Sequence, residues 1–401
     1  MEKKETPIPI IDSFLKTLSG IFGSKKAEKQ VPAKSEEDRS ATELSDIEEF
    51  KKAEAQKKIF QINQSILRST YVSIPGTKIL YKKYEDLGKG GFGNVFVAEF
   101  PDYQNLELEN KKYAVKKINF KSTDPNLSQD KAIQRFLTKN LNEKYIADRI
   151  QKEAGCLKEF LCYYFPNNEP IIDKDYNIWI ISELMTGDLN KLMKVLDLEE
   201  RIDFVNEDLF PTVIKGISDL HEMGLIHSDI KLENILYKDV NDEEIQVKIG
   251  DMGGTCTLLF NELKKQSTDK DCKNCKICLN RFRGTLPYLD PKLYEKFLEN
   301  VYSGNFTKEN LWIKNTDWYG FAITLINFLV GKNIISNREL QRIMQYAAKK
   351  EDTLENLIEM YRAYISSEIK FAIDDHKDKW LKFGLRPDIL KFIQVNTINY
   401  I

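Results

Sequence analysis

The sequence has few cysteines, little net charge and no long hydrophobic run, and each shortage excludes a class of protein. Six cysteines in 401 residues are too few for a disulfide-built scaffold, which suits a reducing compartment, so we expect a cytoplasmic protein. Lys and Arg total 60 and Asp and Glu total 62, so the formal charge is −2 and the basic surplus of a dedicated nucleic-acid binder is missing. The longest apolar run, Phe321–Val330, is much shorter than the ~18 residues of a membrane-spanning helix. It predicts a buried core helix and no transmembrane segment.

The first 75 residues differ in composition from the rest of the chain. Residues 1–40 are polar and mixed in charge, which predicts a flexible N-terminal segment, and an amphipathic stretch runs within it from Ile8 to Phe22. Ser45 and Glu48 form a capping box ahead of a periodic apolar run, so we expect an extension helix within residues 41–75. These stretches could pack on the protein's own domain or bind a protein partner, and the first could also lie on a membrane surface.

After residue 80 the pattern changes first to strands and then to helices. Aromatic and β-branched residues predict four short strands, at Tyr81–Leu87, Val95–Phe100, Tyr113–Phe120 and Ile178–Ser182. A helical region over about Ser128–Phe160 precedes the fourth strand, and the residues beyond Leu189 are mostly helical in pattern. The sequence therefore predicts a small strand-rich lobe over residues 80–189 and a larger helical lobe over residues 190–398.

A glycine-rich turn is the first sign of a binding site. It reads Gly88-Lys89-Gly90-Gly91-Phe92-Gly93 and is followed closely by Val95. The same letters open a helix in dinucleotide-binding folds, whereas here they are followed by a second strand. Glycines at the tip of a hairpin let backbone N–H groups close over nucleotide phosphates. Taken alone, the motif is equally compatible with a plain glycine hairpin.

Charged residues in later motifs can serve the same site. They stand in Tyr113-Ala114-Val115-Lys116, at Glu153 on the predicted helix, in His227-Ser228-Asp229-Ile230-Lys231-Leu232-Glu233-Asn234, and in Lys248-Ile249-Gly250-Asp251-Met252-Gly253. A lysine on a strand offers phosphates a fixed positive charge, and a helix glutamate can hold it by an ion pair. Asp229, Lys231 and Asn234 supply a proton acceptor, a phosphate partner and a metal ligand. Asp251 adds a carboxylate suited to Mg²⁺.

In this order the motifs resemble the eukaryotic protein kinase superfamily. The resemblance continues with Gly284-Thr285-Leu286-Pro287-Tyr288, similar to the end of an activation segment, and with Asp317-Trp318-Tyr319-Gly320, similar to the helix whose aspartate braces the catalytic loop. It covers about Tyr84 to Leu390. It implies an α+β, bilobal protein-kinase-like fold: a small antiparallel β lobe with one regulatory helix, a larger mainly α-helical lobe, and a long activation segment over residues 251–291.

The resemblance implies an ATP site made of a cover, an adenine pocket and a hinge. The cover would be formed by Gly88, Lys89, Gly90, Gly91, Phe92, Gly93 and Val95. Ala114 and Leu236 would enclose the adenine. Glu183 to Met185 would be the hinge, with Asp188 near the ribose. Ser182 would sit at the rear of the pocket. Asp188 is explained equally well as a helix cap, since aspartate is a preferred N-cap residue.

The resemblance also implies the catalytic roles. Lys116 would hold the α- and β-phosphates, paired with Glu153, and Asn234 and Asp251 would ligate Mg²⁺. Asp229 would accept the proton of a substrate hydroxyl while Lys231 steadies the γ-phosphate. His227 is expected to be a buried structural histidine, because the neighbouring carboxylate is better suited to proton transfer.

Lys231 and Thr285 resemble the residues of serine/threonine kinases, and the segment around Thr285 resembles one that docks protein substrates. The prediction is an ATP- and Mg²⁺-dependent kinase that phosphorylates serine or threonine in proteins. The alternative is a nucleotide-binding pseudokinase that acts as a scaffold. The long N-terminal extension favours that alternative, and the retained Lys116, Asp229, Asn234 and Asp251 argue against it.

Three positions depart from the kinase pattern. Ser228 replaces the arginine that normally receives a loop phosphate, so charge pairing through that residue is unavailable. Met252 replaces a phenylalanine, which is a tolerable apolar exchange. Lys292 stands where a glutamate usually pairs with an arginine, expected here at Arg386. Either Glu295 or Asp290 then takes over as the partner, or the segment is anchored differently.

Four cysteines gather in or near the long activation segment. Cys256, Cys272, Cys275 and Cys278 could form a four-thiolate Zn²⁺ site. The spacing does not match a standard paired zinc knuckle, so reduced or redox-active thiols are the alternative.

Overall fold

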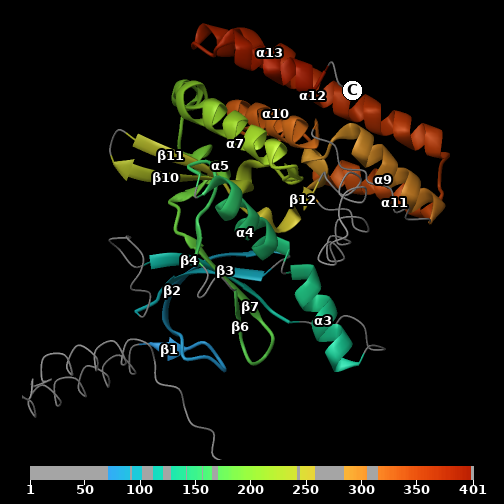
Figure 1. The fold of residues 1–401 in the computed structure, drawn as a ribbon. Coiled ribbons are helices and arrows are strands. Elements are labelled where there is room, and N and C mark those ends of the chain that lie inside the picture. Colours follow the sequence, from blue (N-terminus) through green and yellow to red (C-terminus); the bar gives the residue numbers. More distant parts are fainter. Residues whose placement is uncertain are drawn as a thin grey trace, which may run out of the picture. The chain divides into compact units, whose positions relative to one another are not determined.

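The computed structural model describes residues 71–90, 93–101, 112–120, 128–140, 142–155, 157–164, 170–241, 244–257, 284–304 and 315–398. The chain forms two compact units. Of the described residues, the first unit holds those up to Lys117 together with Ile172–Asn177, and the second unit holds those within 118–171 and from Ile178 onward. Figure 1 shows the first strands in blue to blue-green and the helices that follow in green to red.

The first unit is built on an antiparallel sheet. Its strands are β1 (Val72–Ser73), β2 (Leu80–Gly90), β3 (Gly93–Glu99) and β4 (Lys112–Ile118), each paired with the next. The β2–β3 hairpin closes at the pair Gly90 and Gly93, so the glycine-rich motif lies at its tip, as the sequence predicts. Val95 lies opposite Lys116. Because residues opposite each other in a ladder are neighbours on one face, the register brings these two predicted site residues together.

Of the predicted extension over residues 41–75, only the last five residues are described. There the chain is extended and not helical, because Val72 and Ser73 pair with Tyr81 and Leu80 as strand β1. Ile74 is fully buried, and the turn after it contains Gly76 at φ 79°, a conformation that favours glycine. The rest of residues 1–75 lies outside the described part of the chain.

The second unit is mainly helical. Its helices are α3 (Gln129–Asn140), α4 (Asn142–Ala154), α5 (Leu189–Leu192), α6 (Leu198–Phe204), α7 (Phe210–Glu222), α9 (Pro291–Ser303), α10 (Asn315–Val330), α11 (Asn337–Lys349), α12 (Leu354–Lys382) and α13 (Pro387–Asn396). Its short strands form three groups. Strand β5 (Tyr163–Tyr164) pairs with β7 (Ile178–Glu183), and β9 (Leu225–Ile226) pairs with β12 (Cys256–Thr257). Strand β10 (Ile235–Asn241) pairs with both β8 (Gly187–Asp188) and β11 (Glu244–Ile249). A further strand, β6 (Ile171–Ile172), follows β5 in the chain. A β unit followed by a larger helical unit confirms the predicted α+β class.

The helical region predicted over Ser128–Phe160 is two helices and ends earlier. The Asn140 side chain donates a hydrogen bond to the Phe136 carbonyl (2.8 Å) where α3 ends. Helix α4 stops at Ala154 because Gly155 takes φ 66°, a left-handed conformation that terminates helices. Apolar periodicity continues past this glycine, which is why the sequence pattern overestimates the length of the helix.

Helix α10 runs through the core of the second unit. Every residue from Phe321 to Leu329 is at most 1 % exposed, so the apolar run is a buried core helix, as predicted. The rings of Phe210 and Phe392 pack against Phe321. Burying an aromatic side chain of this kind contributes about 1.5–3 kcal/mol. Among the helices that the structure describes, none has the length and apolar character needed to span a membrane.

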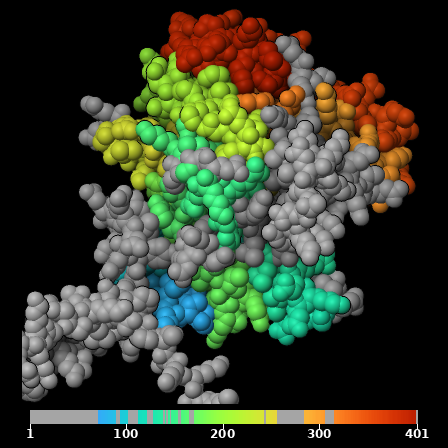
Figure 2. Space-filling view, in the orientation of Figure 1, coloured from blue at the N-terminus to red at the C-terminus, as the bar shows by residue number. Residues whose placement is uncertain are grey.

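A π-helical turn, Val205–Leu209, joins α6 to α7 and aims one asparagine at a distant turn. Asn206 Nδ2 donates to the Gly384 carbonyl (3.0 Å), and Asn206 Oδ1 accepts from the Arg386 backbone N–H (3.2 Å). Gly384 and Arg386 belong to the connection between α12 and α13. In Figure 2 the C-terminal residues, in red, adjoin the yellow-green residues of this region.

We expect Asn206→Ala to lower the free energy of unfolding by about 1–3 kcal/mol, because both polar backbone groups lose a buried partner. Asn356→Ala is the matched control, since the exposed Asn356 amide makes only a surface hydrogen bond to Asp352 (2.9 Å). The control should stay within about 0.5 kcal/mol of the unmodified protein. Denaturant unfolding measures both, and equal losses in the two variants would contradict the assignment.

One cysteine outside the predicted activation segment forms a disulfide. Cys162, just before β5, is disulfide-bonded. The side chains of the other five cysteines lie outside the described part of the structure. The number of cysteines carries no pairing pattern, so a single disulfide could not be predicted from it.

Candidate active site

The predicted hinge begins with a buried carboxylate that two lysines hold. Glu183, at the end of β7, is 7 % exposed. Its Oε2 lies 2.5 Å from Lys248 Nζ and its Oε1 lies 2.9 Å from Lys238 Nζ. The lysines come from the paired strands β11 and β10, so the side chain ties the hinge to this hairpin. Burial by itself raises the pKa of Glu183, but the hydrogen bonds and charges of Lys248 and Lys238 outweigh it and lower that pKa.

A second contact ties the hinge to the same hairpin. Asp188 and Leu236, predicted for the ribose and the adenine, are paired residues of strands β8 and β10. The Asp188 carboxylate accepts a hydrogen bond from the Lys191 backbone N–H (2.8 Å) and caps α5. The structure thus shows the cap that the sequence left open, and the ribose contact stays a prediction. Gly187 must lack a side chain, because an added Cβ would lie 2.8 Å from the Tyr237 ring.

The catalytic loop, residues 227–234, is held by one buried carboxylate of α10. Asp317 is fully buried, and its Oδ2 accepts from the His227 backbone N–H (2.9 Å) and lies 2.9 Å from His221 Nε2. Its Oδ1 accepts from the Ser228 backbone N–H (2.7 Å). The side chain of His227 is buried as predicted, with Nε2 2.9 Å from the Gly250 carbonyl. The aspartate therefore braces the loop in the way that the resemblance implies.

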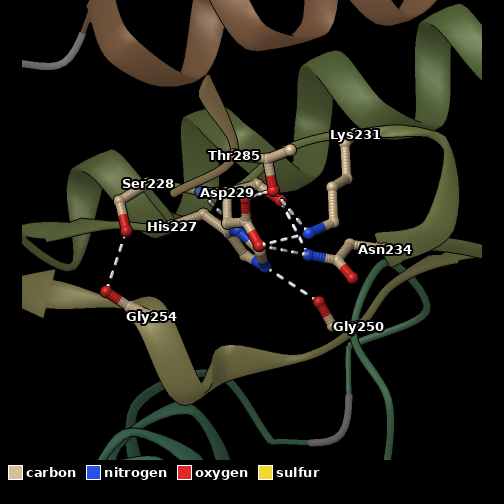
Figure 3. A network of polar contacts seen from close by, with 8 residues as sticks. All are labelled: His227, Ser228, Asp229, Lys231, Asn234, Gly250, Gly254 and Thr285. Atoms are coloured by element: carbon tan, nitrogen blue, oxygen red, sulfur yellow. Dashed lines mark hydrogen bonds and ion pairs between the residues drawn. The ribbon is translucent and has the colours of Figure 1, made fainter. Parts of the chain in front are cut away.

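Three polar side chains converge on the Asp229 carboxylate, as Figure 3 shows for the network around it. Asp229 Oδ2 accepts from Lys231 Nζ (2.7 Å) and from Asn234 Nδ2 (3.1 Å). Asp229 Oδ1 accepts from the Thr285 hydroxyl (2.8 Å), and Thr285 Oγ1 lies 2.7 Å from Lys231 Nζ. The structure therefore brings three predicted catalytic-loop residues together with the threonine of the later segment. Such a set can hold an ionised carboxylate and a lysine in one fixed geometry.

The donors available for a metal are oxygens. Asn234 Nδ2 also donates to the Asp229 carbonyl (2.8 Å), so its amide oxygen is turned away from Asp229 (Figure 3). Asp251 is half-buried and takes φ 58°, and its neighbour Gly250 donates its backbone N–H to the Asn234 carbonyl (2.8 Å). A carboxylate and an amide oxygen are the ligands that Mg²⁺ takes, usually together with substrate phosphates. These residues therefore fit Mg²⁺.

The predicted zinc site falls outside the described residues. Cys272, Cys275 and Cys278 are not described, and the side chain of Cys256 is not described either. Within the described part of the chain, no group of three or more His, Cys, Asp or Glu side chains is placed to hold a metal ion. The zinc prediction remains a prediction.

A glutamate that the sequence reading passed over is the buried carboxylate of α4. Glu143 is 4 % exposed, whereas the side chain of Glu153, the residue chosen from the sequence, lies outside the described residues. The Tyr163 hydroxyl lies near Glu143: burial, followed by the charges of Glu143 and Asp251, raises the pKa of Tyr163 well above 10. Glu143 is thus close to the segment that carries Asp251. Other charged residues of α4 stand at similar distances from the apolar residues Ile146 and Ile150, so the sequence pattern alone could not identify it.

The residues predicted to contact ATP from the first unit are only partly described. Gly88, Val95, Ala114 and Lys116 lie on β2, β3 and β4. Gly91 and Phe92, at the tip of the hairpin, are not described. The contacts of these residues with a nucleotide stay a prediction.

The segment after Thr285 is anchored without the expected arginine. Arg386, predicted as the partner, pairs instead with Asp388 on the surface (2.6 Å). Glu295 of α9 receives two hydrogen bonds from Arg362 of α12, at 2.6 and 2.7 Å. Asp290 is fully buried and caps α9 by accepting from the Lys292 backbone N–H (2.9 Å). Glu295 is thus an anchor, as one of the alternatives held, but its arginine is Arg362, on a helix whose place in the fold the sequence pattern does not give.

The comparisons agree with this geometry. Residues 81–382, most of the chain, match the protein kinase domain. The serine/threonine-protein kinase dst1 of Dictyostelium discoideum is 29 % identical over 279 residues, covering 68 % of this chain and 29 % of that protein. The inhibitor of nuclear factor kappa-B kinase subunit alpha of Danio rerio is 31 % identical over 221 residues, covering 53 % of this chain and 23 % of that protein. The interferon-induced, double-stranded RNA-activated protein kinase of Rattus norvegicus is 24 % identical over 327 residues, covering 74 % of this chain and 56 % of that protein.

The fold and the arrangement around Asp229 define a protein kinase domain. The chain belongs to the eukaryotic protein kinase superfamily and is of the serine/threonine type. It spans between about a quarter and a little over half of the length of these relatives.

The ion pairs of Glu183 should make stability depend on pH. The folded pKa lies below the unfolded value near 4.5, so the stabilisation is complete above about pH 4.5 and is lost as pH falls through the folded pKa. We therefore expect the excess stability of the unmodified protein over Glu183→Gln to be constant near neutral pH and to shrink on acidification. Thermal midpoints of both proteins from pH 7 to about pH 3.5 measure this difference. A difference that grows in acid would contradict the ion-pair assignment.

Proposed function

We propose that the protein transfers the γ-phosphate of ATP, in the presence of Mg²⁺, to serine or threonine hydroxyls of protein substrates. Lys116 and the glycine-rich motif would bind the phosphates, and the backbone of Glu183 to Met185 would bind the adenine. Asn234 and Asp251 would hold Mg²⁺, which neutralises phosphate charge when bound. Membership of the family and the serine/threonine type of its relatives support this proposal.

The observation that carries the proposal is the held carboxylate of Asp229. Lys231 and Thr285 both contact it, so its oxygens keep one orientation before a substrate arrives. In the proposed reaction Asp229 orients the substrate hydroxyl and accepts its proton, and Lys231 steadies the transferred phosphoryl group. Phosphoryl transfer depends mostly on positioning and charge neutralisation, which such a rigid set provides.

We propose that the acidic residues near this site favour basic side chains beside the acceptor. Glu233 is exposed within the catalytic loop, and the half-buried Asp188 lies nearby on β8, paired with β10. Such acidic residues attract basic peptides and so raise the rate and specificity of binding more than its affinity. A peptide array in which Arg or Lys near the acceptor gives no gain would remove this part of the proposal.

The direct test is phosphate transfer from labelled ATP to a generic basic protein and to the protein itself. Asp229→Asn keeps the shape of the side chain but removes the proton acceptor, so transfer should fall by about 100-fold or more. Asp374→Asn, on the exposed face of α12 where Asp374 pairs with Lys377, is the control and should stay within about twofold.

Failure of this test would point to a scaffold. No transfer by the unmodified protein, with ATP and Mg²⁺ still raising its melting temperature, would leave a nucleotide-binding protein that acts by positioning partners. The N-terminal segments over residues 1–75 would then be the first place to search for a protein partner.

We further propose that Glu143 fills the helix-glutamate role that the sequence assigns to Glu153. A buried carboxylate is retained only where a cation or hydrogen bonds compensate it, and Glu143 is buried on the helix that neighbours Asp251. Glu143→Gln should lower kcat/KM at least about tenfold, because it removes the buried charge beside the segment that carries Asp251. Glu153→Gln, on the same helix, should change it less than about twofold. The reverse order of the two variants would restore the assignment made from the sequence.

A further inference from the structure

Ser228 is the least kinase-like residue of the catalytic loop, and its hydroxyl has a specific partner. Ser228 is buried, and its Oγ donates to the Gly254 carbonyl at 2.8 Å (Figure 3). Its backbone takes φ 69°, a left-handed conformation that is uncommon for residues other than glycine. The surrounding contacts must therefore hold it there, and the bond from its N–H to Asp317 is one of them.

The Ser228 hydroxyl makes a hydrogen bond between two strands just beyond the point where their backbone pairing ends. Strands β9 and β12 pair Leu225 with Thr257 and Ile226 with Cys256. Two residues further along this antiparallel register, Ser228 lies opposite Gly254. There the Ser228 N–H is directed to Asp317, so it does not serve the ladder, and the side-chain hydroxyl supplies a hydrogen bond to the facing carbonyl.

These two residues approach closely, and a side chain at position 254 would crowd the Ser228 hydroxyl. A Cβ built on Gly254 would lie 3.2 Å from Ser228 Oγ and 3.5 Å from the His227 carbonyl oxygen. An arginine at position 228, usual in the family, carries its nearest donor three methylene groups from the backbone. It could not make this short contact at the same separation of the two segments.

The hydrogen bond between Ser228 and Gly254 gives the segment around Asp251 an anchor on its C-terminal side as well as on its N-terminal side. On the N-terminal side, Gly250 is bound through its N–H to the Asn234 carbonyl (2.8 Å) and through its carbonyl to His227 Nε2 (2.9 Å). On the C-terminal side, Gly254 is bound to Ser228. Asp251 itself takes φ 58° and costs conformational energy, so its position depends on anchors on both sides.

We propose that the Ser228 hydroxyl is a positioning group that fixes Asp251 and the start of the activation segment against the catalytic loop by a direct, neutral hydrogen bond. The consequence for regulation is that this part of the site is assembled by the chain itself and needs no phosphate on a partner residue. This inference rests on the proposed function only where it concerns the use of Mg²⁺, because the hydrogen bond and its effect on local mobility belong to the unliganded protein.

The test compares Ser228→Ala and Ser228→Gly by hydrogen exchange of peptides that cover residues 252–257, in the full chain without ligand. Both variants lack the hydroxyl, but glycine adopts φ 69° without strain, so the pair separates the loss of the bond from backbone strain. We expect exchange in these peptides to speed up about 3- to 10-fold in both variants, as follows from losing a hydrogen bond of typical strength. Ser218→Ala is the matched control, because Ser218 Oγ also donates to a backbone carbonyl at 2.8 Å, that of Ile214 within α7. It should leave exchange over residues 252–257 unchanged.

The second readout is the Mg²⁺ concentration that gives half-maximal phosphate transfer. It should rise about 3- to 10-fold in both Ser228 variants and not in Ser218→Ala, because a loosened Asp251 binds the metal less well. Unchanged exchange over residues 252–257 in both variants would overturn the proposal, as would a change in Ser228→Ala that Ser228→Gly does not share. If the unmodified protein transfers no phosphate, the exchange measurement still decides the role of Ser228.

Discussion

The active site depends on one buried carboxylate, that of Asp317. It emerges from the helix that forms the centre of the core, and both of its oxygens are used by backbone or ring nitrogens of the neighbouring segments. A fully buried charge is stable only when hydrogen bonds compensate it. Because the first two residues of the catalytic loop supply those hydrogen bonds, a displaced loop would leave the charge uncompensated. The core is therefore stable only when the catalytic loop has its observed geometry.

This coupling explains how strained residues persist next to Asp229. Ser228 and Asp251 both take left-handed conformations, and each lies beside a residue or group that the core holds in place. A flexible loop would relax to ordinary backbone angles. The rigid frame of α10 keeps these two residues in the positions that bring Lys231, Asn234 and Thr285 around one carboxylate.

Much of this arrangement could be predicted from the sequence, since motifs at fixed spacing record local geometry. The glycine hairpin, the buried run of α10 and the buried His227 follow from residues close to one another in the chain. The bracing role of Asp317, which acts on residues 89 and 90 positions away, follows from the resemblance to the kinase motifs. The choice between the glutamates of α4 stays a prediction, because α4 carries several charged residues and periodicity does not say which of them faces inward. The burial of Glu143 is a tertiary property, which the sequence pattern does not record. The partner of Glu295 lies 67 residues away on α12, and no local pattern identifies it.

The hydrogen bonds that close the second unit join residues far apart in the chain. Arg201 contacts the Phe328 carbonyl across 127 residues, and Asn206 contacts Gly384 across 178. Contacts of this range form late, since closing long loops costs entropy before any contact compensates it. During synthesis, Asn206 of the π-helical turn can therefore find its partners only after the connection between α12 and α13 has been made. The match to the family ends at residue 382, but the folding unit ends later, after α13. A shortened protein that stops at residue 382 would expose the amide of Asn206 and the rings that Phe392 covers. Its core would be only partly buried, and such exposed apolar surface is what chaperones bind.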